Sequence, residues 1–319
     1  MNVREILKQG IEARVLADAK REASLPPAMR FGNSGAIIDG VVFGNCPRLA
    51  HLRLLGFQTA SDASTQVMFA SGRAMEHILY DFLSAALPPE RIKREDEAAI
   101  KYLTPSGLPV TGRPDFILLD ENGNYETGIE CKGKMSFWGV KSLLIDGKGY
   151  ASHIVQGAHY MWKHGLKNYG LTYVVPVKYL IPREDKAVWP KEYIGRSGGG
   201  WAVNPQLFTL LLSTAADGTL VVEMHDGVVH KTKLKVGHID AFYASVEEMG
   251  EGKPLAPMPS AKGVFGKPSW KACDYCPLKD VCDTETAYGP WLDKAVDTIT
   301  GTWQENWPDF LDEYLGGWV

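Results

Sequence analysis

The chain has 319 residues, of which 45% are hydrophobic and 23% are charged, and its formal net charge is −4. This composition is typical of a soluble globular protein with a substantial core, and the length suffices for one large domain or two ordinary ones. No apolar run approaches the roughly 18 residues that a membrane helix needs, so we expect no membrane contact. The acidic balance excludes a protein coated in basic charge, but it leaves room for a local basic channel.

Hydrophobic periodicity predicts helices and strands in alternation along the chain. Helices are expected over 2–24, 48–57, 66–87, 153–166 and 238–252, and strands within 91–103, 108–120, 125–134, 171–181 and, as a hairpin, 219–236. Residues 25–47 are interpreted as loop-rich and residues 183–201 as a mobile polar loop. The alternation indicates an α/β core, a central mixed sheet flanked by helices. We expect an N-terminal helix in 1–29, one domain over 30–285 and an acidic, aromatic tail over 286–319.

A predicted hairpin brings an acidic pair together. The turn "ENGN" has Asn122-Gly123 at its centre, the strongest short hairpin signal. Asp115 and Glu130 therefore lie on adjacent antiparallel strands. Lys132 follows Glu130 by two residues and shares its face, whereas Cys131 faces the other way.

Two acids and a lysine on one face suit phosphodiester hydrolysis. The carboxylates of Asp115 and Glu130 would hold Mg²⁺ or Mn²⁺, and Lys132 would orient the attacking water. The backbone carbonyl of Cys131 is a further candidate ligand. The alternative is a solvent-facing strand on which Glu130 and Lys132 form a surface ion pair.

The chain has five cysteines. An odd number, in the reducing compartment that we expect, argues against a disulfide framework. Three of them, Cys273, Cys276 and Cys282, lie close together in "CDYCPLKDVC", which is typical of a metal site. A closed thiolate site needs a fourth ligand, for which Cys46 and Cys131 are the candidates. Thiolate count alone does not separate zinc from an iron–sulfur cluster, because both accept four sulfurs. Without any family resemblance, zinc is the favoured occupant.

Basic and aromatic residues follow the third strand of the hairpin region. Lys134, Trp138 and Lys141 suit a single nucleic-acid strand, because the lysines pair with phosphates and the indole stacks on bases. A solvated loop is the alternative interpretation. Arg48, beside Cys46, is a further candidate DNA contact.

The order of these motifs resembles the PD-(D/E)XK nuclease superfamily, in its RecB-like branch. "GRPD" followed by "ECK" is similar to the family's core motif, "GRAMEHILYDFL" to its preceding helix, and "QGAHY" to its Gln-x-x-x-Tyr motif. The resemblance implies a restriction-endonuclease-like core. It implies that His77, Asp115 and Glu130 bind the metal, that Lys132 is catalytic, and that Gln156 and Tyr160 support the site.

The cysteines resemble those of the iron–sulfur members of this branch, such as the CRISPR-associated exonucleases and the AddB nuclease domain. The resemblance implies a [4Fe–4S] cluster as a clasp between the N- and C-terminal segments, with zinc as the second choice. Its ligands would be Cys46, Cys273, Cys276 and Cys282. The resemblance covers about residues 30–285 and is weakest over 182–240.

The sequence as a whole thus predicts a metal-dependent DNA exonuclease for recombination or repair. It would act on single strands or DNA ends, and the family resemblance implies 5′-to-3′ polarity. The alternatives are a non-catalytic DNA-binding or assembly module and an endonuclease subunit of a DNA-processing complex. DNA is the expected partner, and a homo-oligomer or a recombination protein is left open. The charged N-terminus is not a signal peptide, so we expect a cytoplasmic protein, in the host cytoplasm if a phage encodes it.

Overall fold

The computed structural model of the protein describes residues 3–24, 29–30, 35–54, 63–104, 107–134, 136–147, 150–198 and 200–250. The helices are α1 (Val3–Ser24), α2 (Pro47–Leu54), α3 (Ala63–Ala86), α4 (Phe137–Leu144), α5 (Ala151–Lys163) and α6 (Val236–Gly250). The predicted cysteine cluster and the C-terminal tail lie outside the described residues, so those predictions stay predictions.

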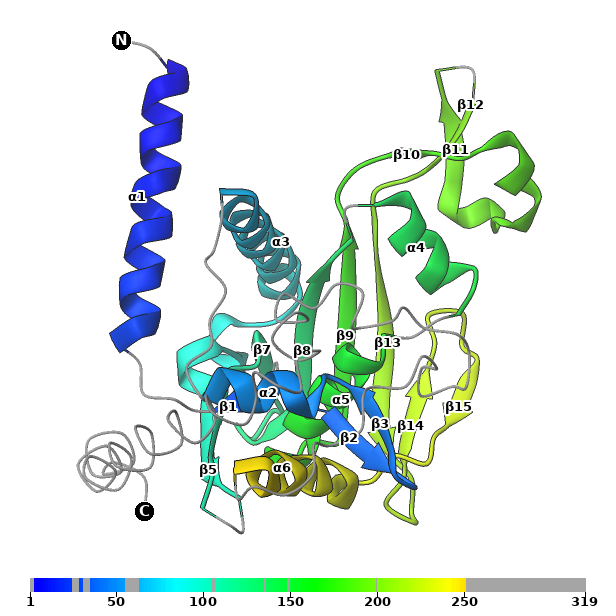
Figure 1. Ribbon diagram of the computed structural model, residues 1–319. Coiled ribbons are helices and arrows are strands. Elements are labelled where there is room, and N and C mark those ends of the chain that lie inside the picture. The colour runs from blue at the N-terminus through cyan, green and yellow to red at the C-terminus, as the bar shows by residue number, and fades with distance from the viewer. Residues whose placement is uncertain are drawn as a thin grey trace.

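The strands are short, apart from three that run through the centre of the molecule (Figure 1). Their bounds are β1 Met29–Arg30, β2 Gly35–Ile38, β3 Val41–Gly44, β4 Ile92–Arg94, β5 Ile100–Leu103, β6 Pro109–Gly112, β7 Phe116–Leu119, β8 Tyr125–Gly133, β9 Asn168–Val175, β10 Tyr179–Leu180, β11 Ile194–Ser197, β12 Gly200–Val203, β13 Gln206–Thr214, β14 Leu220–Glu223 and β15 Val229–Lys231.

A seven-stranded mixed sheet forms the framework, in the order β15-β14-β13-β9-β8-β7-β4. Only the central pair, β8 and β9, is parallel, and α4 and α5 form the crossover between these two strands. The other pairs are antiparallel. The predicted α/β core, a central mixed sheet flanked by helices, is therefore confirmed.

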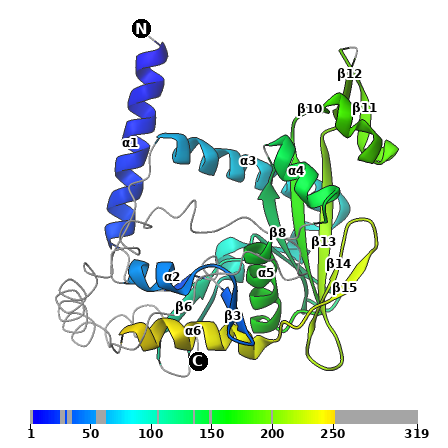
Figure 2. The same ribbon diagram turned by 45° about the vertical axis from the view of Figure 1, so that its right-hand side comes forward.

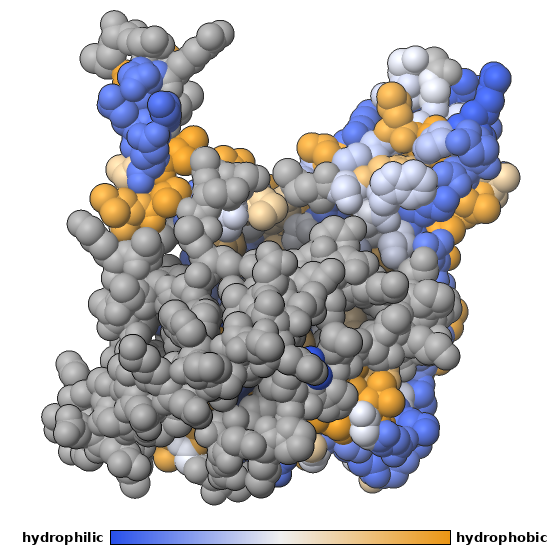
Figure 3. All heavy atoms as spheres, in the orientation of Figure 1, coloured by the Kyte–Doolittle hydropathy of each residue, from blue (hydrophilic) through white to orange (hydrophobic). Residues whose placement is uncertain are grey.

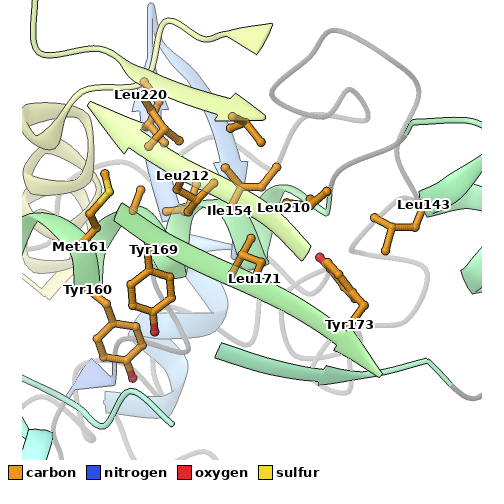
Figure 4. Close-up of a cluster of buried hydrophobic side chains, with 14 of the residues drawn as sticks. Leu143, Ile154, Tyr160, Met161, Tyr169, Leu171, Tyr173, Leu210, Leu212 and Leu220 are labelled. Atoms are coloured by element: carbon orange, nitrogen blue, oxygen red, sulfur yellow. The ribbon is translucent and has the colours of Figure 1, made fainter. Parts of the chain in front are cut away.

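The two faces of the sheet are covered by different helices. On one face α5 packs against β8, β9 and β13, and Tyr169, Leu171 and Tyr173 of β9 are fully buried there (Figure 4). On the other face Met75 and Leu79 of α3 pack against Phe116 and Cys131. The central strands are thus buried on both sides, as the parallel pairing of β8 and β9 requires.

Two segments contain strands that the sequence analysis missed. Residues 25–47, interpreted as loop, contain the β2–β3 hairpin, whose turn residues Asp39 and Gly40 have φ of 51° and 77°. This is the geometry for which Asp-Gly turns are favoured, so the signal was present in "GAIIDGVVFG". The second missed strand is β13, which pairs with β9 over eight residue pairs.

The predicted mobile loop over 183–201 is wrong. These residues form most of a second, three-stranded antiparallel sheet, in the order β10-β12-β11. Two short 3₁₀ turns, Arg183–Val188 and Lys191–Tyr193, connect its strands. We call residues 179–203 the arm, because they project beyond α4 and away from the main sheet (Figures 1 and 2).

The predicted apolar face of α3 is only half correct. Met75 and Leu79 are buried, but Val67, Phe69 and Phe82 are more than half exposed. The buried stripe therefore follows one side of the helix, and several apolar side chains elsewhere on α3 stay exposed, although α1 also contacts this helix. Among the described helices, none is both long enough and apolar enough to cross a membrane.

Candidate active site

The hairpin between β7 and β8 fixes the register of the two predicted acids. Phe116 pairs with Ile129, so Asp115 and Glu130 are next to each other across the two strands. In the turn, Asp120 Oδ1 accepts hydrogen bonds from the backbone N–H groups of Asn122 and Asn124, at 2.8 and 2.9 Å. The turn thus holds the register that places the acids together.

Glu130, Lys132 and Gln156 form a closed triangle of hydrogen bonds. Lys132 Nζ donates to Glu130 Oε1 at 2.8 Å and to Gln156 Oε1 at 3.1 Å. Gln156 Nε2 in turn donates to Glu130 Oε1 at 3.0 Å. The amide orientation is fixed chemically, since the flipped amide would aim its NH₂ group at the ammonium.

Tyr169 holds the other oxygen of the buried Glu130. Its hydroxyl donates to Glu130 Oε2 at 3.0 Å. Its ring lies over Gly128, where an added Cβ would be 2.3 Å from the ring. Gly128 is therefore a requirement of the site, because any side chain there would displace the tyrosine that holds Glu130.

The environment of Asp115 disfavours its ionised form. Burial raises its pKa well above the usual value, and the neighbouring charge of Glu130 raises it further. The backbone N–H of Cys131 opposes this by donating to Asp115 Oδ2 at 2.6 Å. The half-buried Asp115 and the buried Glu130 thus destabilise each other when both are ionised, which is the electrostatic setting in which a cation binds.

Tyr160 fixes the backbone before Asp115. Its hydroxyl donates to the carbonyl of Arg113 at 2.9 Å and accepts from the N–H of the same residue at 3.0 Å. Its ring stacks on that of Tyr169, with centroids 5.9 Å apart and planes 11° apart (Figure 4). The Gln-x-x-x-Tyr pair therefore acts at two places, Gln156 on Glu130 and Tyr160 on the "GRPD" loop.

The pKa values of Lys132, on β8, and Lys134, just after it, are shifted in opposite directions. Burial opposes the charged form of Lys132, but the attraction of Glu130 outweighs it and raises the pKa. Burial lowers the pKa of Lys134 to about 8, and the charge of Lys132 acts in the same direction. Lys134 Nζ lies 3.6 Å from the centroid of the Tyr150 ring, a cation–π contact in place of an acidic partner.

The structure does not bring His77 to the carboxylates, since its side chain is exposed on α3. Its neighbour Glu76 is the residue that is coupled to them. Burial raises the pKa of Glu76, as do the charges of Glu95 and Glu130, and the charge of Glu76 in turn raises the pKa of Asp115. Successive side chains on a helix point about 100° apart. Glu76 directly follows the buried Met75 and is half-buried, whereas His77, one residue further on, is exposed.

The donor set fits a hard divalent cation. In the described part of the chain, no group of three or more His, Cys, Asp or Glu side chains is arranged as a ready-made metal site. Mg²⁺ is usually held by only one or two carboxylates together with water and substrate phosphates. Glu130 accepts three hydrogen bonds, which leaves about one of the four acceptor positions of a carboxylate.

The cysteines divide between the described and undescribed parts of the chain. Cys131 is buried against α3, on the side of the sheet opposite Glu130 and Gln156, as strand alternation predicts. Burial raises the pKa of its thiol to about 12. Cys46 is half-buried at the start of α2, and its three predicted partners lie outside the described residues.

The predicted DNA contacts are on different elements. Trp138, at the start of α4, is 67% exposed. Lys141, on the same helix, pairs with Asp185 of the arm at 2.5 Å. Arg48 lies on α2, which packs against α6. Of the four predicted contacts, Lys134, Trp138 and Lys141 therefore follow the C-terminal end of β8, and Arg48 lies on a different element.

Sequence reasoning missed Glu76 and Tyr169 as site residues. Glu76 could not be separated from His77, because apolar residues lie on both sides of α3 and only the packing decides which side faces the sheet. Tyr169 was not detectable, since nothing in "NYGLTYVV" distinguishes its hydroxyl from those of other strand tyrosines.

Comparisons with known proteins give little further information. No protein-family model matches the chain, and no curated protein matches it significantly. Among solved structures, SSO0001 aligns with a TM-score of 0.43 at 13% identity, over 88% of this chain and 97% of that one.

The coupling of Glu76 predicts a pH-dependent gain in stability when its charge is removed. Its folded pKa is raised above the ordinary 4.5, so its cost to folding grows as the pH rises through this range. Glu76→Gln should therefore melt at a higher temperature than the wild type at about pH 8, with the gain lost near pH 4. The measurement is thermal unfolding followed by circular dichroism in EDTA. His77→Gln, one residue away, is the matched control; equal melting temperatures for the two variants at the higher pH would contradict the placement of Glu76.

Proposed function

We propose that the protein is a metal-dependent deoxyribonuclease of the RecB-like PD-(D/E)XK type, with a restriction-endonuclease-like core. The observation that carries this proposal is the closed Glu130–Lys132–Gln156 triangle beside the half-buried Asp115. A surface ion pair does not account for it, because Glu130 is only 4% exposed and accepts three hydrogen bonds. Retaining this acidic pair costs stability, which favours a functional reason for it.

The residues of the chain have separable roles in this reaction. Asp115, Glu130 and the carbonyl of Cys131 would hold Mg²⁺ or Mn²⁺, which when bound would activate water and neutralise charge on the phosphate. The ion pair with Glu130 at 2.8 Å favours the protonated form of Lys132, so our proposal does not use Lys132 as a general base. Lys132 would instead orient the attacking water by donating a hydrogen bond and stabilise the charge that develops on the phosphate.

Glu76, next to the exposed His77 on α3, is a further candidate for the cation site. A third carboxylate coupled to Asp115 and Glu130 adds negative charge where a divalent cation would bind. Gln156 holds Glu130, and Tyr160 holds the loop before Asp115, so both are positioning residues. Lys134 would contact a substrate phosphate, since its ammonium lacks a carboxylate partner among the described residues.

We propose exonuclease activity on single strands or DNA ends, in recombination or repair. Exposed Trp138, next to Lys141 at 5.2 Å, supports an unpaired strand, because stacking on an indole needs a free base face. Polarity from 5′ to 3′ rests on the sequence resemblance alone.

We further propose a [4Fe–4S] clasp formed by Cys46, Cys273, Cys276 and Cys282. Its support is the sequence pattern, and the packing of Cys131 among apolar side chains on the α3 side of the sheet favours Cys46 as the fourth ligand. Protein purified without oxygen should contain iron and acid-labile sulfide and absorb visible light. A colourless protein with stoichiometric zinc would contradict the cluster but not the nuclease proposal.

The nuclease proposal predicts that Lys132 is required for cleavage. Purified wild type should shorten an end-labelled single strand with Mn²⁺ and not with EDTA, and Lys132→Ala should be at least about 100-fold slower, since it loses a charge contact to the transition state. The exposed Lys167→Ala, which only breaks an ion pair with Glu126, is the matched control and should cleave normally.

The substrate form separates the alternatives. A circular single strand has no end and should resist an exonuclease, so its cleavage would favour the endonuclease hypothesis. Binding of the strand without any metal-dependent cleavage would contradict the enzyme proposal and favour a non-catalytic DNA-binding module.

A further inference from the structure

The arm is joined firmly to the elements that carry the candidate site. Tyr179 donates a hydrogen bond to the backbone carbonyl of Lys134 at 3.1 Å. Lys141 of α4 pairs with Asp185 of the arm, and Phe137 packs on the buried Trp189 with centroids 5.8 Å apart. These contacts hold the arm against α4 and the end of β8, two residues beyond Lys132.

Two cations on the arm share one indole ring. Lys186 Nζ lies 4.2 Å from the centroid of the Trp201 ring, and the guanidinium carbon of Arg196 lies 5.0 Å from the same centroid. Both cationic side chains are exposed. Each cation–π contact is modest, but together they hold two like charges near each other, and an anion between or beside them would relieve their repulsion.

The charge balance of the arm strengthens this preference for an anion. Between residues 179 and 203 there are four basic and three acidic residues, and one of the acids, Asp185, is already neutralised by Lys141 of α4. The surface of the arm is mixed, with apolar residues among hydrophilic ones (Figure 3), and Leu180 is 70% exposed. Cations interspersed with flat or apolar side chains are what an unpaired nucleic-acid strand requires.

We propose that the arm and α4 form the binding wall for an unpaired nucleic-acid strand that leads to Asp115 and Glu130. Phosphates of the strand would contact Lys186 and Arg196, and a base would stack on Trp138. This inference rests on the proposed function, because it assigns the arm to the substrate of that same site. It names the substrate class as a single-stranded segment and gives residues 179–203 a role.

The test measures binding in EDTA, where no cleavage is needed. A fluorescent oligothymidine is titrated at several salt concentrations against wild type, Lys186→Ala/Arg196→Ala and the charge-matched control Lys167→Ala/Lys233→Ala, whose exposed lysines lie on other elements. Loss of two phosphate contacts should weaken binding about tenfold or more and reduce the salt slope by about 1.4, since each contact to a single strand contributes about 0.7.

Three controls make the result decisive. Lys186→Arg/Arg196→Lys keeps both charges and should retain the wild-type slope, which separates charge from folding. Trp138→Ala should weaken oligothymidine more than duplex DNA. An unchanged slope in the double alanine variant, an equal loss in the control pair, or equally effective competition by poly-glutamate would overturn the proposal. If the wild type cleaves DNA but the variants show no such binding changes, only the proposed role of the arm is refuted. If the protein binds the strand in this way but does not cleave it, only the proposed nuclease activity is refuted.

Discussion

The burial of Glu130 is the constraint on which the rest of the candidate site depends. A carboxylate that is 4% exposed must have its charge compensated, and here three donors do so: Lys132 from the same strand, Gln156 from α5 and Tyr169 from β9. These donors come from three different elements, β8, α5 and β9, so the site exists only when these elements are folded together. Stability and site geometry are therefore coupled in this protein.

The same constraint explains why ionised Asp115 lowers the stability of the folded protein. Glu130 has its donors, but Asp115 receives the backbone N–H of Cys131 and faces the charges of Glu130 and Glu76. The lysine is held on Glu130, so one ammonium does not neutralise three carboxylates. A divalent cation would compensate this excess of negative charge. In our proposal the arm and α4 then bind the nucleic-acid strand that leads to this cation.

Local patterns predicted the parts of the site that depend on one element or one turn. The Asn-Gly turn fixed the pairing of Asp115 with Glu130, strand alternation separated Lys132 from Cys131, and helical spacing placed Gln156 and Tyr160 on one side of α5. The failures involve tertiary packing: whether Glu76 or His77 faces the sheet depends on which side of α3 is buried, and both sides are apolar. The arm was misread because its Gly-rich, charged sequence resembles a loop, although Trp189 and Trp201 give it a packed interior.

The most direct test of this account is whether a divalent cation relieves the repulsion at Asp115. With Mn²⁺ at about 100 times its dissociation constant, binding should stabilise the wild type by about 2.7 kcal/mol, a rise in melting temperature of roughly 5–10 °C. Asp115→Asn removes the strained charge, so it should melt higher than the wild type in EDTA and respond little to Mn²⁺. A wild type that does not respond to Mn²⁺, or an Asp115→Asn variant that responds equally, would contradict the account.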